Sequence, residues 1–156
     1  MSNAVRGFVA LMLLAAAQLV AAAGCSVTSA SMAFGTTSAG VAGPVDTQGT
    51  LSFTCTGVLG ETVVYTVSLS AGGGGTGFNP RALRSGANSI QYNVYGDSAR
   101  TRLWGDGTSG TFTESGSLSI TGGPTPRSVP VYGRVFGGQS AKPGAYSDSL
   151  MITISF

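Results

Sequence analysis

The side chains that could do chemistry in this sequence are few, and they are scattered. There is no histidine, so the commonest general base and the commonest metal ligand are missing. None of the six carboxylates forms a close pair in sequence: Asp46, Glu61, Asp97, Asp106, Glu114 and Asp148. No nucleophile is accompanied by a base and an orienting group. The sequence therefore predicts no enzyme, no catalytic residue and no metal or cofactor site, although folding could still bring two carboxylates together as glycoside hydrolysis requires.

Three positions in the middle of the chain could bind something or could be structural. Asp97 and Arg100 form either a binding ion pair or a turn that Asp97 caps, and the turn is favoured. Asp106 lies between two glycines like a fragment of a calcium loop, but the other oxygen ligands at alternate positions are missing, which favours a tight turn. Trp104 is either a core aromatic or an exposed contact for a partner.

A run of four glycines, 72–75, could in principle cradle a phosphate group. No helix pattern, lysine or GK[ST] sequence follows the run, as a phosphate loop requires. We therefore expect a mobile hairpin tip at this position.

The first 23 residues are predicted to be a secretory signal peptide. Arg6 is the only charge before Asp46, an apolar run follows it, and small residues end the segment, which predicts cleavage after Ala23. The alternative, a membrane anchor, is disfavoured because the apolar run is short and no positive cluster follows it. The mature domain is then 24–156.

The two cysteines, Cys25 and Cys55, are predicted to form a disulfide, because an exported chain with an even number of cysteines usually pairs them. Such a bond would contribute about 3–4 kcal/mol in the chain-entropy model. An alternative makes Cys25 a lipidated first residue, since the preceding Ala22-Ala23-Gly24 loosely resembles a lipobox. Lipidation would leave Cys55 as a free thiol.

The elements that must position these residues are strands. Apolar and polar side chains alternate over several short segments: 51–55, 63–70, 90–95, 117–121, 129–136 and 150–156. Turn sequences rich in glycine and proline separate them, at 42–44, 105–107, 122–124 and 142–144. Six or seven strands with one apolar face each predict an all-β fold, a single antiparallel β-sandwich.

The last strand reaches the end of the given sequence at Phe156. A sandwich needs each edge strand paired, covered or blunted. This apolar strand has no later strand to pair with, so the sequence is compatible with a sandwich that lacks its final strand.

Several short motifs follow one another along the mature chain. The longest is the segment Tyr92–Gly107, YNVYGDSARTRLWGDG. The others are Cys25-Ser26-Val27 with Met32-Ala33-Phe34-Gly35 after it, Cys55-Thr56, Val131-Tyr132-Gly133-Arg134-Val135, and the ending Pro143–Leu150 followed by an alternating strand. In their order and spacing these motifs resemble the spore coat protein U family, and the resemblance covers essentially the whole mature chain.

The family includes pilins of archaic, Csu-type chaperone–usher pili and proteins named for a spore coat. The resemblance implies an incomplete immunoglobulin-like sandwich. A periplasmic chaperone lends a strand to its open groove, and the N-terminal extension of the next subunit replaces that strand during assembly through an outer-membrane usher. The expected partners are therefore chaperone, usher and neighbouring pilin or coat subunits. The expected acceptor groove follows the last strand: Leu150, Ile152, Ile154 and Phe156.

The resemblance also predicts a location and a position in the assembly. The protein would cross the periplasm and end at the cell surface. Cleavage after Ala23 leaves only Gly24 before Cys25, whereas polymerising pilins of this kind carry a donor segment there. We therefore expect an acceptor-only subunit, at a tip or terminus. A stand-alone surface adhesin is the alternative. The net charge of +2 without a basic block predicts no nucleic-acid partner, and no small-molecule substrate is expected.

Overall fold

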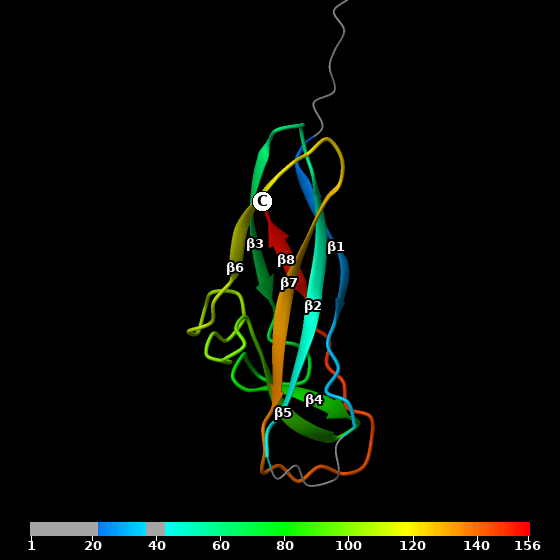
Figure 1. Cartoon of the computed structure of the whole chain (residues 1–156). Coiled ribbons are helices and arrows are strands. Elements are labelled where there is room, and N and C mark those ends of the chain that lie inside the picture. The colour runs from blue at the N-terminus through cyan, green and yellow to red at the C-terminus, as the bar shows by residue number, and fades with distance from the viewer. Residues whose placement is uncertain (1–21, 37–42) are drawn as a thin grey trace, which may run out of the picture.

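The described part of the chain forms eight β-strands in two antiparallel sheets (Figure 1). The structure is a computed structural model, and it describes residues 22–36 and 43–156; the predicted signal peptide lies almost wholly outside the described residues. The strands are β1 (Gly24–Ser31), β2 (Val45–Thr56), β3 (Thr62–Leu69), β4 (Arg81–Ser85), β5 (Asn88–Tyr95), β6 (Glu114–Ser119), β7 (Thr125–Val135) and β8 (Ile152–Ser155).

The sheets form a sandwich around one apolar core. The larger sheet has the order β1-β2-β7-β5-β4, and the smaller has β6-β3-β8. Alternation places one face of each strand inward, as in β3, where Val63, Tyr65 and Val67 are buried and Val64 is exposed. Phe53 of β2 meets Tyr65 edge-to-face, with ring centroids 4.9 Å apart. The predicted all-β sandwich is confirmed.

The outward faces of both sheets are covered largely by hydroxyl side chains. In the smaller sheet these are Thr62, Thr66, Ser68, Ser115, Ser117, Ser119, Thr153 and Ser155. In the larger sheet they include Ser26, Ser29, Ser31, Thr50, Ser52, Thr54, Thr56 and Ser128. Alternation with the buried residues on the same strands accounts for both sets.

The segment between β5 and β6 joins the two sheets through Trp104. Its backbone N–H donates to Val94 O of β5 (2.9 Å), and its indole N–H donates to Val67 O of β3 (3.1 Å). Trp104 is fully buried. The motif that surrounds it therefore holds the two layers together.

Two strands, β1 and β4, are not predicted by the alternation of apolar and polar residues. Val27 is the only large apolar side chain in β1, and β4 is short and contains two arginines, so neither shows a clear alternation. Among the described residues, no helix is long and apolar enough to cross a membrane.

Candidate functional site

A cavity of about 980 Å³ opens between the two sheets on the side where β1 and β8 lie. Its walls come from both sheets, from the segment after β1 and from the loop before β8. The lining is mostly apolar and includes Met32, Phe34, Leu83, Tyr92, Leu150 and Ile152. A cavity of this kind, bounded by two strand edges, is large enough for several side chains at once.

The β8 edge of the cavity carries main-chain groups that face away from the sheet. Ser70 N donates to Met151 O (2.9 Å), and Met151 N donates to Ser70 Oγ (2.8 Å), so Met151 bonds toward the β3 side. Because bonding direction alternates along a strand, Ile152 and Ile154 turn their N–H and C=O groups away from β3. Beyond β3, β8 has no other hydrogen-bonded neighbour among the described strands.

The end of β1 also lines the cavity, through Ala30 and Ser31, and the disulfide shows how the start of the strand is paired. The predicted bond between Cys25 and Cys55 is present, and it links directly opposed residues of β1 and β2 with Cα atoms 4.1 Å apart. So short a separation marks a non-hydrogen-bonded antiparallel pair. The N–H and C=O groups of Cys25 therefore point away from β2, and so do those of Val27. Val27 also faces inward opposite Phe53, yet it is 40% exposed.

The four predicted groove residues lie along the β8 edge, but they differ in depth. Leu150 and Ile152 line the cavity. Ile154 packs partly buried against the core farther along β8, opposite Val67. Phe156, just after β8, is 57% exposed.

A polar cluster that the sequence analysis did not identify closes one end of the cavity. Tyr92 Oη donates to Asp148 Oδ2 (2.8 Å), and both residues line the cavity. Burial raises the pKa of Tyr92 above its ordinary value, and the hydrogen bond to Asp148 adds to the effect. Fully buried Arg81 lies near both, and burial lowers the pKa of its guanidinium. Asp148 was recognised only as part of a family motif, because its partners are far away in sequence.

The glycine run 72–75 cradles a carboxylate of the chain itself. Asp148 Oδ1 accepts the N–H groups of Gly73 (2.9 Å) and Gly74 (3.2 Å). Gly74 is buried, and a Cβ there would overlap the carbonyl of Ala82. The expectation of a mobile hairpin tip is therefore wrong, because the run is packed between β4 and the segment that leads into β8.

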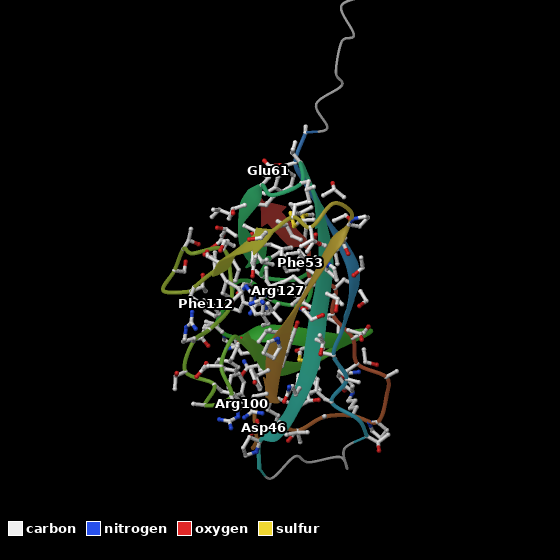
Figure 2. All side chains as sticks on the ribbon, turned by 45° about the horizontal axis from the view of Figure 1, so that its top comes forward. Asp46, Phe53, Glu61, Arg100, Phe112 and Arg127 are labelled. Atoms are coloured by element: carbon white, nitrogen blue, oxygen red, sulfur yellow. A yellow bond between two sulfur atoms is a disulfide. The ribbon has the colours of Figure 1, made fainter. Side chains whose placement is uncertain are left out.

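The two aspartates singled out from the sequence form turns. Asp97 Oδ1 accepts Arg102 N (2.7 Å) and Thr101 N (3.0 Å), which lowers the pKa of Asp97. Arg100 does not pair with Asp97 but with Asp46 of β2 (3.2 Å), and Figure 2 shows these two together at one end of the sandwich. Asp106 Oδ1 accepts Thr108 N (2.9 Å) and Thr108 Oγ1 (2.6 Å), which closes a tight turn.

The exposed-contact interpretation of Trp104 is wrong. Its exposed fraction is 0%, because the indole lies between the sheets and its ring packs against Phe112, with ring centroids 5.8 Å apart. Among the described residues, no group of three or more histidine, cysteine or carboxylate side chains could hold a metal ion.

The chain is similar to known proteins both in sequence and in structure. The family model "Spore Coat Protein U domain" matches residues 11–153. Protein U of Myxococcus xanthus is 34% identical over 111 residues, which are 69% of this chain and 59% of that protein. One chain of the crystal structure of the CsuC–CsuE chaperone–tip adhesion subunit pre-assembly complex, from archaic chaperone–usher Csu pili of Acinetobacter baumannii, superposes with a TM-score of 0.59 and 24% identity. It covers 86% of this chain and 40% of that one. This chain thus spans about three fifths of the curated relative and two fifths of the structural one.

Proposed function

Because the chain belongs to the Spore Coat Protein U domain family, we propose that it is a structural subunit of a surface fibre or coat, and that it assembles by accepting a β-strand. The strand would enter the groove between β1 and β8. The chain would act by assembly and not by catalysis.

The observation that carries this proposal is the pair of open edges beside one cavity. Ile152 and Ile154 on β8 direct main-chain hydrogen-bonding groups away from β3, and Cys25 and Val27 on β1 direct theirs away from β2. Both strands also contribute to the cavity wall, β8 through Ile152 and β1 through Ala30 and Ser31. Strand addition uses such groups for affinity and uses pockets for alternate side chains to set the register. The apolar walls at Leu150 and Ile152 supply such pockets.

The partners that we propose follow from the structural relative, whose title names a chaperone and a tip adhesion subunit of a chaperone–usher pilus. For this chain they are a periplasmic chaperone, an outer-membrane usher and neighbouring pilin or coat subunits. Export through the inner membrane and a final position at the cell surface are part of the same proposal.

We also propose that this subunit accepts a strand without donating one. Cleavage after Ala23 would leave Gly24 as the first residue, and Gly24 already begins β1, where it lies opposite Thr56 of β2. No residues would then remain in front of β1 to serve as a donor segment.

The test is native mass spectrometry of the protein released gently from its own periplasm. A one-to-one complex with a second chain of chaperone size is the expected result. The subunit mass after dissociation then reports the cleavage site and whether a donor segment remains. A lone monomer, lighter by two hydrogens for the disulfide, would contradict strand acceptance and would favour the stand-alone adhesin.

A further inference from the structure

Another stretch of unpaired edge lies on β7, inside the larger sheet. β7 pairs with β2 along its whole length, from Thr125 to Val135. On its other side it pairs with β5 only through Tyr132 to Val135. Residues 125–131 of β7 therefore have no hydrogen-bonded neighbour on that side among the described strands. A second open edge would offer an incoming strand an alternative place to add.

Two prolines remove donors from this stretch of edge. Cys25 and Cys55 form a non-hydrogen-bonded pair, so Cys55 bonds toward β7, where it lies opposite Thr125. By alternation, residues 126, 128 and 130 turn their main-chain groups away from β2 and toward the open side. Pro126 and Pro130 occupy two of these three positions, and proline has no N–H to donate. Ser128 keeps the remaining donor.

A charged side chain lies between the two prolines. Arg127 is opposite Phe53, which is fully buried, so Arg127 starts from the core-facing side of β7 (Figure 2). The residue is nevertheless exposed, which shows that its side chain turns out to solvent at the open edge. Inward-pointing charges and edge prolines are two established ways in which sheets avoid unwanted pairing.

The β8 edge has neither kind of protection. Its strand, Ile152–Ser155, contains no charge and no proline, and its outward-directed main-chain groups belong to Ile152 and Ile154. We propose that Pro126, Arg127 and Pro130 block strand addition at β7, so that an incoming strand does not pair there instead of in the groove between β1 and β8. This inference rests on the proposed function, because it assigns the residues that decide which edge accepts a strand.

The experiment restores the missing donors and measures self-association of the full mature chain. The variant is Pro126→Val/Pro130→Val, and the matched control is Pro124→Val, one residue before β7. Sedimentation velocity over a concentration series is combined with hydrogen exchange of β7 and β8, with and without a synthetic donor peptide of about a dozen alternating apolar and polar residues. Two restored hydrogen bonds per chain should lower the concentration needed for self-association about tenfold or more.

We expect the N–H groups of residues 126, 128 and 130, which face the open side of β7, to become protected from exchange as the double variant associates, while that of Ser128 stays unprotected in the wild type and in Pro124→Val. Arg127→Thr, which keeps both prolines, is a second variant and should shift association in the same direction. The inference is overturned if both variants associate like the wild type and the N–H group of Ser128 stays unprotected in both. Protection confined to β8 overturns it while supporting strand acceptance in the groove. Protection at β7 without any peptide binding at β8 supports it and contradicts the proposed function.

Discussion

At the scale of single residues, the glycine run and Asp148 show how a short segment fixes one end of the groove. Asp148, in the segment before β8, accepts hydrogen bonds from two glycine N–H groups and from the hydroxyl of Tyr92. It therefore links that segment to the loop between β3 and β4 and to β5. This arrangement requires the backbone of the glycine run to lie close to β4 and to Asp148. At Gly74 a Cβ would overlap the carbonyl of Ala82, and at Gly72 it would overlap the carboxylate of Asp148 itself.

We expect Gly74→Ala to destabilise the protein by about 1–3 kcal/mol, because the added methyl group would overlap the backbone of Ala82. Gly73→Ala is the matched control, since a Cβ there meets only Asp148 Oδ1 at 4.0 Å. Urea unfolding of both variants checks the prediction. Equal stabilities would show that the run is not packed as described.

The turn at Asp97 should make part of the stability depend on pH. Hydrogen bonds from Arg102 N and Thr101 lower the folded-state pKa of Asp97 below the ordinary 3.8. A carboxylate whose folded-state pKa is lowered stabilises the fold at pH values above its ordinary pKa. This stabilisation is lost as the pH falls through the folded-state pKa. Asp97→Asn, whose amide does not titrate, should therefore be less stable than the wild type near neutral pH.

The difference between Asp97→Asn and the wild type should shrink below about pH 4. Urea unfolding between about pH 6 and about pH 2.5 measures it. A difference that stays constant over this range would mean that the carboxylate charge of Asp97 does not contribute. Asp46 and Asp106, whose pKa values are also lowered, keep some acid sensitivity in both proteins.

At the scale of elements, β8 is the strand on which the proposed strand acceptance would depend. Its inward side chains pack against the core, while the main-chain groups of Ile152 and Ile154 face the opening. The side chains of β8 thus contribute to folding, while its main-chain groups are free to bind an incoming strand. Substitutions that affect only one of them can separate folding from strand acceptance.

We expect Ile154→Pro to weaken binding of an alternating donor peptide about tenfold more than Ile154→Ala does. Both variants lose the isoleucine side chain, but only proline also removes the N–H that faces the opening. The bond to β3 is spared in both, because Ile154 lies in a non-hydrogen-bonded pair with Val67. Calorimetry with the peptide measures the ratio, and equal affinities of the two variants would place the incoming strand elsewhere.

The elements also show how far the sequence predicts this structure. Six strands were predicted because alternation persists where one face is buried, as in Val63–Leu69. β1 and β4 show no such pattern, because β1 has a single large apolar side chain and β4 is short and contains two arginines. The groove was predicted along β8, but the Asp148 cluster was not, because it depends on contacts between residues some 75 positions apart. Trp104 was ambiguous, because the sequence does not reveal which layer covers an aromatic ring in a loop.

At the scale of the whole molecule, the stability of the folded chain should increase when a partner strand occupies the groove. A ligand that binds only the folded chain stabilises it by mass action, by about 2.7 kcal/mol at a hundredfold excess over Kd. We therefore expect the thermal midpoint to rise with the concentration of an alternating donor peptide. A peptide of the same composition in scrambled order is the control. If both peptides shift the midpoint equally, the groove does not recognise a strand.

The hydroxyl faces of the two sheets have a consequence for any material built from this subunit. Side chains such as Ser117 and Thr153 on one face, and Ser52 and Thr54 on the other, do not change charge over the ordinary range of pH. The outward face of the larger sheet also carries Asp46 and Arg134, but they lie at one end and neutralise each other in an ion pair that Arg100 joins. A filament that displays these faces would therefore present a hydrated surface with few isolated charges, whose properties depend only weakly on pH and on the concentration of salt.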